Sequence, residues 1–265
     1  MGSYLDARAA GGLWLMRVED LDRDRVLEGC AAQMLATLEA FGLNWDGEVT
    51  YQSERTGAYA DALARLEALG LTFACSCSRR ERLGEGRYPG TCRAGPRRAG
   101  PTATRLRVPD TTLTFSDRIQ GECRFDFAER GDVVIRRRDG AFAYQLAVVV
   151  DDALQGISDV VRGADLIDST PWQILLQESL GLPAVRYAHL PLVTEPAGAK
   201  LAKSRRSVPL DPRAAGPQLY EALRLLGQSP PAELKPESPE VLIAWAQMRW
   251  TIEPLQGIRS VPASD

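Results

Sequence analysis

A short apolar run that ends in a group of carboxylates places the strongest constraint on how this chain folds. Residues 13–18 (LWLMRV) follow two glycines and lead directly into Glu19, Asp20 and Asp22. A continuous apolar run of this length predicts a strand that is buried on both faces. Because open α/β sheets bind their ligands beyond the carboxyl ends of their strands, the acids are expected to lie at a binding site.

Helical spacing follows this run. Residues 56–69 carry Tyr59, Leu63 and Leu66 on one face and end before a glycine. Residues 26–41 also repeat apolar side chains at helical spacing, while Pro171 and Gly181 frame a later helix. A strand followed by helices predicts an α/β layer.

The rest of the chain divides into segments of different character. Residues 144–150 and 157–161 are predicted to be apolar strands or buried segments, residues 102–135 alternate like short strands, and the pattern from residue 211 is helical. We therefore expect an interrupted α/β domain whose two parts are residues 1–74 and 136–210. Residues 75–135 would form a partly β insertion, and residues 211–265 a short helical tail.

Composition and charge limit the compartment and the kinds of partner. No apolar run approaches the roughly 20 residues that span a bilayer, and the start of the chain lacks a basic signal sequence, so we expect a cytoplasmic protein. The net charge is −3, so local basic patches would have to hold any nucleic acid. Residues 75–107 contain nine Arg and two Glu; a solvated surface is the alternative interpretation.

Three of the five cysteines lie close together in the sequence, at Cys75, Cys77 and Cys92. An odd, clustered set argues against a disulfide framework and favours one metal site, and thiolates suit tetrahedral zinc. The sole histidine, His189, is distant in sequence, so the fourth ligand stays open, with three unrelated buried thiols as the alternative. The candidates for the fourth ligand are Tyr88, Glu81, Glu85 and Cys123.

Two lysines in a loop that follows Pro196 and Gly198 form a candidate phosphate site. Lys200 and Lys203 are three positions apart, so both amines can reach one polyphosphate and follow the charge that develops on a leaving pyrophosphate. Two lysines at this spacing are also common on solvated surface loops, which is the alternative.

Charged and hydroxyl side chains at predicted strand ends form a candidate substrate site. Glu19 can hold an ammonium group, and Arg162 can grip a carboxylate with two hydrogen bonds. Tyr144 can offer its hydroxyl to the same pocket. The alternatives are an ordinary surface ion pair for the two charges and a core aromatic for Tyr144. Asp151 and Asp152 can serve acid–base chemistry, although helix capping is the commoner use of such paired carboxylates.

Taken in order, six stretches resemble the glutamyl and glutaminyl branch of the class I aminoacyl-tRNA synthetases. They are RVEDLD (17–22), YQSER (51–55), YQLAVVVDD (144–152), VRGADL (161–166), HLPL (189–192) and KLAKS (200–204). The resemblance extends from residue 2 to near residue 209 and becomes weaker in the helical tail. It implies a Rossmann-like catalytic domain with an insertion.

Within that branch, the chain is similar to the glutamyl-queuosine tRNA(Asp) synthetases. That similarity implies zinc held by Cys75, Cys77, Tyr88 and Cys92, and it agrees with the absence of room for an anticodon-binding part after residue 209. The implied reaction is ATP-dependent activation of glutamate and its transfer to queuosine in tRNA(Asp). A monomer is expected.

The resemblance also implies roles for the candidate site residues. Glu19, Tyr144 and Arg162 would contact glutamate. Residues 200–204 would be the K-M-S-K-S-type loop, in which Lys200 and Lys203 are catalytic and Lys203 binds ATP. An alanine replaces the central serine of that loop but leaves both amines in place.

One departure separates this sequence from the family pattern. Family members begin with a strand and an H-I-G-H-type ATP-binding segment, whereas this chain starts inside the helix that follows it, so we expect further sequence upstream of Met1. The alternative functions are conventional charging of tRNA(Glu) and a non-catalytic module that binds tRNA or zinc.

Overall fold

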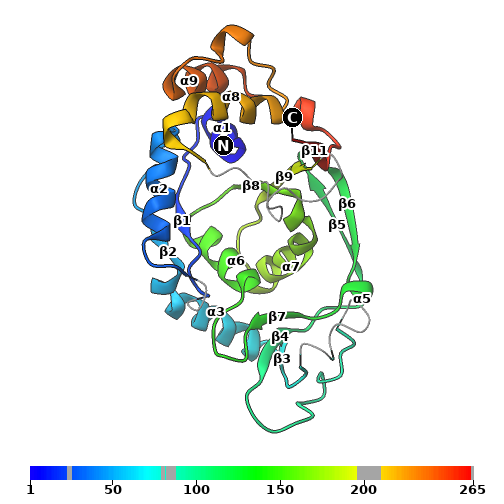
Figure 1. The fold of residues 1–265 in the computed structure, drawn as a ribbon. Helices are drawn as coiled ribbons and strands as arrows, with labels where there is room; N and C mark the ends of the chain where they lie inside the picture. The colour runs from blue at the N-terminus through cyan, green and yellow to red at the C-terminus, as the bar shows by residue number, and fades with distance from the viewer. Residues whose placement is uncertain (23–25, 79–80, 82–87, 196–209, 264–265) are drawn as a thin grey trace.

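Helices and strands alternate along the chain in the computed structural model, which describes residues 1–22, 26–78, 81, 88–195 and 210–263 (Figure 1). The α-helices are α1 (Gly2–Ala9), α2 (Cys30–Ala40), α3 (Thr56–Ala68), α5 (Phe127–Arg130), α6 (Tyr144–Leu154), α7 (Thr170–Leu180), α8 (Ala215–Leu225) and α9 (Pro239–Arg249). Short 3-10 helices are η2 (Gln52–Glu54), η3 (Ala164–Ser169), η5 (Pro212–Ala214), η6 (Ala232–Leu234) and η7 (Glu253–Leu255).

The strands form four small sheets in the described part of the chain. They are β1 (Arg17–Val18), β2 (Thr50–Tyr51), β3 (Thr72–Cys75), β4 (Ala103–Leu106), β5 (Thr112–Asp117), β6 (Gly121–Asp126), β7 (Val133–Arg136), β8 (Asp159–Gly163), β9 (Arg186–Leu190), β10 (Leu192–Thr194) and β11 (Ser260–Pro262). The largest sheet has the order β6-β5-β9-β8, with β8 and β5 parallel to β9 and β6 antiparallel to β5. The α/β prediction is confirmed, with mixed sheets.

Residues 75–135 contribute to two sheets. Strand β4 pairs antiparallel with both β3 and β7, at the end of the molecule opposite the tail helices (Figure 1). The hairpin of β5 and β6 instead joins β9 through the pair Asp117 and Tyr187. This second connection places Asp117 beside the strands that carry the candidate site.

Helix α6 lies at the centre of the largest apolar core, between α3 and α7 (Figure 1). The strand alternative for residues 144–150 is therefore wrong, although the segment is buried as expected. The run Val148–Val150 favours a strand locally, but a segment enclosed by other elements must satisfy its own backbone groups, and a helix does so internally. Tertiary burial overrides the local propensity here.

The predicted strand at residues 13–18 is also mostly wrong. Only Arg17–Val18 pairs regularly, parallel to Thr50–Tyr51, and Leu13 is 72% exposed. Residues 13–16 bond irregularly instead, because the Trp14 carbonyl accepts from Asp46 and its N–H donates to the Asp46 carboxylate. The acids that follow do lie beyond a strand end, but that strand is two residues long.

Two predicted helices are confirmed and one is shorter than expected. Helix α3 buries Tyr59, Leu63 and Leu66, and α7 has its proline in the first turn and ends at Gly181, whose φ is 62°. Helix α2 begins only at Cys30, because the apolar residues before it are exposed. No helix in the described ranges is long and apolar enough to cross a membrane.

The predicted tail helices pack on the start of the chain. Leu219 and Leu223 of α8 and Leu242 of α9 share a core with Tyr4 and Leu5 of α1, and all five are almost fully buried. The first and last parts of the sequence therefore stabilise each other.

This packing predicts the effect of shortening side chains on α9. Replacing Leu242 by alanine removes a fully buried side chain and should lower the free energy of unfolding by about 2 to 5 kcal/mol. The matched control is Met248→Ala on the same helix, where a side chain that is 79% exposed should change stability by less than about 0.5 kcal/mol. Urea titration of both variants tests this, and equal effects would show that α9 does not belong to the core.

Candidate active site

A cavity of about 940 Å3 lies between α1, residues 12–17, the helix α6 and the strand β8. Three predicted site residues line it together, namely Glu19, Tyr144 and Arg162. The other charged side chains that line the same space include Arg17 and Asp152. Arg17 and Arg162, which are 145 positions apart in the sequence, thus meet at one opening.

Arg162, on β8, is held by side chains from three other elements. Its Nε donates to Nε2 of His189 on β9 at 3.1 Å, and Nη1 donates to the hydroxyl of Tyr144 on α6 at 3.1 Å. Its Nη2 donates to Thr170 Oγ1 at 2.9 Å and to Gln173 Oε1 at 2.7 Å, both on α7. The guanidinium is therefore fixed in one orientation beside the cavity.

Tyr144 stands at the first turn of α6, where its ring contacts the apolar core and its hydroxyl reaches Arg162. Burial raises the pKa of this hydroxyl, and the charge of Arg162 offsets part of that effect. The hydroxyl consequently stays protonated and can donate a hydrogen bond into the cavity while it accepts one from Arg162.

Arg17 joins two carboxylates that also line the cavity. Its Nη1 donates to Asp152 Oδ1 at 2.7 Å, and its Nη2 lies 3.4 Å from Glu19 Oε1. Burial raises the pKa values of Glu19 and Asp152, and Arg17 lowers them only in part. The charged forms of these two acids are thus less favourable than in water, so a cation entering the cavity would stabilise them.

Asp151 is fully buried and binds three donors, two from the segment that precedes α3 and one from α3 itself. It accepts from Gln52 Nε2 at 2.9 Å, Arg55 Nε at 2.7 Å and Tyr59 Oη at 2.7 Å. Capping was the commoner use expected for Asp151 and Asp152, and that expectation is wrong. Both stand near the carboxyl end of α6 and bind side chains of other elements, because a buried carboxylate needs charged or polar partners.

The lysine loop cannot be placed beside this cavity. Lys200 and Lys203 belong to residues 196–209, which lie outside the residues that the structure describes. Strand β10 leads toward them and pairs in parallel with β11 near the end of the chain.

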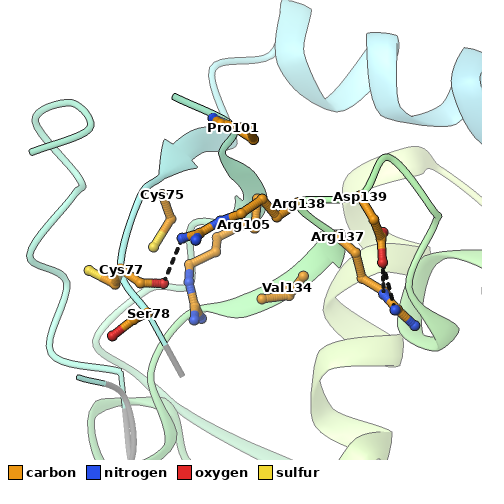
Figure 2. A pocket seen from close by; sticks show the side chains of 10 residues that line it. Cys75, Cys77, Ser78, Pro101, Arg105, Val134, Arg137, Arg138 and Asp139 are labelled. Atoms are coloured by element: carbon orange, nitrogen blue, oxygen red, sulfur yellow. Dashed lines mark hydrogen bonds and ion pairs between the residues drawn. The ribbon is translucent and has the colours of Figure 1, made fainter. Parts of the chain in front are cut away.

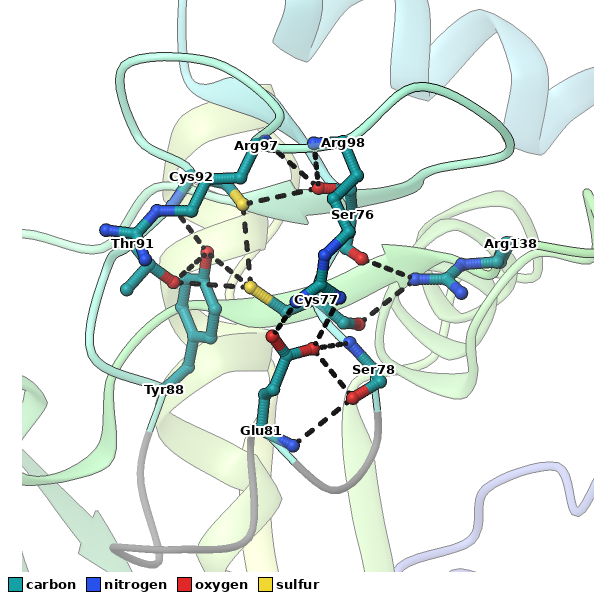
Figure 3. A network of polar contacts seen from close by, with 10 residues as sticks. All are labelled: Ser76, Cys77, Ser78, Glu81, Tyr88, Thr91, Cys92, Arg97, Arg98 and Arg138. Carbon is teal, nitrogen blue, oxygen red and sulfur yellow. Dashed lines mark hydrogen bonds and ion pairs between the residues drawn. The ribbon is translucent and has the colours of Figure 1, made fainter.

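The three predicted cysteine ligands form one cluster at the end of β3. Figure 3 shows two of them, Cys77 and Cys92, beside Tyr88. The Sγ atoms of Cys75, Cys77 and Cys92 all lie within 4.8 Å of one another, and Cys77 and Cys92 are 3.5 Å apart. The hydroxyl of Tyr88 lies 3.5 Å from Cys75 Sγ and 4.0 Å from Cys77 Sγ. Ligands of a tetrahedral zinc with bonds of about 2.3 Å are separated by roughly 3.8 Å, so these four donors match its size.

Other fourth-ligand candidates lie elsewhere or have other partners. Cys123 packs with Phe125 and Ile167 in a separate apolar cluster, and Glu81 binds Ser78 and Arg98. Glu85 lies outside the described residues. Although burial raises the pKa of Cys92, hydrogen bonds from Tyr88 and its neighbours prevail and lower it to about 6, so this thiol is already inclined to be a thiolate.

A second cavity, of about 550 Å3, opens beside the cysteine cluster (Figure 2). Arg138 crosses its wall and donates to the carbonyls of Ser76 and Cys77, while Arg137 binds Asp139. Arg105 stacks on the ring of Tyr88 at 3.8 Å. Arg138 and Arg105 therefore both contact the segments that carry the cysteine cluster.

The sequence motifs predict no site role for several residues in and behind the first cavity. Arg17 lies inside a motif and lines the cavity, whereas Thr170 and Gln173 on α7 and Asp117 on β5 lie behind it. A usable signal exists for the α7 pair, since they are polar residues three positions apart on the helix face that also buries Leu176 and Leu180.

Comparison with known proteins agrees with this geometry. The family model described as "tRNA synthetases class I (E and Q), catalytic domain" matches residues 1–223. The chain is 55% identical over 252 residues to the Glutamyl-Q tRNA(Asp) synthetase of Ectopseudomonas mendocina, covering 94% of this chain and 86% of that protein. It is 52% identical to the protein of the same name from Pseudomonas fluorescens, covering 99% of this chain and 89% of that protein.

Among solved structures, the fold resembles the glutamate-tRNA synthetase of Elizabethkingia anophelis. The TM-score is 0.80 at 22% identity, and the match covers 99% of this chain and 63% of that one. At this identity the likeness supports the fold and nothing finer.

The buried contacts of Asp151 predict how the motifs around the cavity depend on one another. Asp151→Ala leaves Arg55, Gln52 and Tyr59 without their acceptor and should lower the free energy of unfolding by about 3 kcal/mol or more. Tyr59→Phe removes one of these bonds and keeps the packing, so it should lower that free energy by about 1 kcal/mol. Denaturant unfolding compares the two, and a loss at Asp151 no larger than that at Tyr59 would contradict this role.

Proposed function

Because this chain belongs to the class I tRNA synthetases of the E and Q type, we propose that it activates glutamate with ATP and transfers it to queuosine in tRNA(Asp). The chain is an aminoacyl-tRNA synthetase-like ligase. The choice of queuosine rests on the relatives named Glutamyl-Q tRNA(Asp) synthetase, which cover nearly the whole chain. The observation that carries the substrate is the cavity in which Glu19, Tyr144 and Arg162 meet.

Arg162 and Tyr144 would bind the side-chain carboxylate of glutamate together. The guanidinium has five N–H groups, and Nε and Nη2 already donate to His189, Thr170 and Gln173. Nη1 keeps one N–H beyond its bond to Tyr144. Instead of a two-pronged grip by Arg162 alone, the carboxylate would accept from Nη1 and from the Tyr144 hydroxyl.

Glu19 would hold the α-ammonium group of the substrate. Burial raises the pKa of Glu19, and the positive charge of Arg17 offsets this effect only in part. A bound ammonium group would therefore stabilise the Glu19 carboxylate further. Opposite charges at the two ends of the cavity would fix the direction in which glutamate lies and leave its α-carboxylate free to react. Glutamine would lose the ion pair with Arg162, and its amide NH2 group would place a donor where the carboxylate offers a second acceptor.

Lys200 and Lys203 would act on ATP. When the glutamate α-carboxylate attacks the α-phosphate, pyrophosphate leaves and glutamyl-adenylate forms. The lysine ammonium groups would stabilise the charge that develops on the departing phosphates. Transfer to the tRNA then releases AMP.

Zinc would be held by Cys75, Cys77, Cys92 and Tyr88. Three thiolates and a phenolate leave no open position for a substrate, so the metal would stabilise the insertion and take no part in the chemistry. Residues 76–78 and 88–101 contribute few apolar side chains to a core, which is why a metal is needed to fix them.

Metal analysis tests the zinc proposal. The purified chain should contain about one zinc per molecule, and Cys92→Ser should lose zinc and become sensitive to protease within the insertion. The matched control is Cys123→Ser, which alters a thiol outside the cluster and should retain the metal. Absence of zinc from the unaltered protein, or unchanged zinc content in Cys92→Ser, would remove the proposal.

Transfer of radiolabelled glutamate tests the proposed reaction. We expect glutamate to enter tRNA(Asp) that contains queuosine, and neither queuosine-free tRNA(Asp) nor tRNA(Glu). Arg162→Gln should weaken glutamate binding on the order of 10- to 100-fold because it removes a charge-assisted bond. The control Arg213→Gln alters a guanidinium that is 90% exposed and should leave binding unchanged.

Each alternative has a distinct result in this experiment. Labelling of tRNA(Glu) alone would indicate conventional charging. Binding of tRNA without glutamyl-adenylate formation, tested by ATP–pyrophosphate exchange, would indicate a non-catalytic module.

A further inference from the structure

A buried chain of hydrogen bonds lies behind Arg162 and crosses three adjacent strands. Asp117 ends β5, His189 lies on β9 and Arg162 lies on β8, in the sheet order β5-β9-β8. Asp117 Oδ2 lies 2.6 Å from His189 Nδ1, and His189 Nε2 lies 3.1 Å from Arg162 Nε. The side chains of Asp117 and His189 have no exposed surface.

The partners of Asp117 determine which ring nitrogen of His189 carries the proton. Its Oδ1 accepts from the backbone N–H groups of Ile119, Gln120 and His189 at 2.8 to 3.1 Å. Burial raises the pKa of Asp117, but these bonds and the one from the imidazole prevail and lower it, so the side chain is a carboxylate. A carboxylate only accepts, and the hydrogen between Oδ2 and the ring must therefore reside on Nδ1.

The proton on Nδ1 leaves Nε2 of His189 as an acceptor. Arg162 Nε–H is always a donor, since the guanidinium does not lose its proton in proteins. In the other imidazole tautomer, the Nε2–H of His189 would face the Nε–H of Arg162 across 3.1 Å, and the guanidinium would have to turn away. The stacked ring of Tyr187, 6.1 Å away by centroids, limits the room for the imidazole itself to turn.

We propose that Asp117 and His189 are positioning residues for substrate recognition: Asp117 holds His189 in the Nδ1–H tautomer, and His189 Nε2 then fixes the guanidinium of Arg162 with Nη1 toward the cavity. Neither residue touches the substrate. What Arg162 binds rests on the proposed function, whereas the hydrogen-bond order does not.

Asp117→Asn separates this role from simple space filling. The amide keeps an oxygen for the three backbone donors, but its NH2 group faces Nδ1 and can only donate there. His189 must then carry its proton on Nε2, opposite Arg162 Nε–H. A correct shape with the wrong tautomer is known to disable an active-site histidine in the serine proteases.

The chain contains one histidine, so its tautomer can be measured without assignment ambiguity in tag-free protein. Nitrogen-15 NMR of the full chain should show the proton on Nδ1, and on Nε2 in Asp117→Asn. Calorimetry should show glutamate affinity falling at least about 10-fold in that variant, as for one lost hydrogen bond to a charged group. Affinity for ATP alone should not change.

Two substitutions of His189 keep the test decisive if Asp117→Asn folds poorly. His189→Asn retains a donor toward Asp117 but removes the acceptor for Arg162, and should bind glutamate as weakly as Asp117→Asn. His189→Gln places its oxygen where Nε2 was and should recover most of the affinity. Equal glutamate affinity in both would overturn the proposal.

The outcomes for this inference and for the proposed function are distinguishable. If the unaltered chain binds no glutamate, the proposed function fails, and exchange protection of Arg162 Nε–H still decides the inference. Protection in the unaltered chain and its loss in Asp117→Asn would support positioning. A proton on Nε2 in the unaltered chain, or unchanged protection in the variant, would overturn it.

Discussion

The need to satisfy the partly buried guanidinium of Arg162 determines how the centre of this molecule is assembled. A charge that is partly withdrawn from water needs partners for its hydrogen-bonding groups. Those partners come from α6, α7 and β9, so one side chain sets the relative positions of the helices and strands around the cavity. These bonds occupy Nε and Nη2 of Arg162, so one N–H of Nη1 stays available for a ligand. The packing around Arg162 thus limits how a ligand can bind to it.

A second group of charged side chains connects the segments around Arg17 and Gln52 to α6. Asp151, fully buried on α6, holds the segment that carries Gln52 and Arg55, and Asp20 accepts from both the N–H and the hydroxyl of Ser53. Arg17 bonds to Asp152 one residue further along α6. The five motifs that the structure describes are thus connected to one another by side-chain bonds around one opening, although they are widely separated in the sequence.

Residue types and spacing predicted the α/β class, two helices and the residues that gather at the cavity. They did not predict the secondary structure of the segments that carry those residues. Tyr144 was expected beside a strand and stands on α6, because a run of valines favours a strand until burial on every side decides otherwise. The strand at residues 13–18 failed because pairing partners, which lie elsewhere in the chain, determine a strand. The cluster of Cys75, Cys77 and Cys92 was predictable, since short spacing alone brings such thiols together. The link from Asp117 to Arg162 was not, because it depends on the order of strands in the sheet.

We propose that the cavity holds glutamate with its side-chain carboxylate at Arg162 and its ammonium group at Glu19. A crystal structure of the chain with bound glutamate would decide this. We predict one carboxylate within hydrogen-bond distance of both Arg162 Nη1 and the Tyr144 hydroxyl, the ammonium group beside Glu19, and the bond from Arg162 Nε to His189 unchanged. Glutamate bound outside this cavity, or with its ammonium group toward Arg162, would rule out this binding mode.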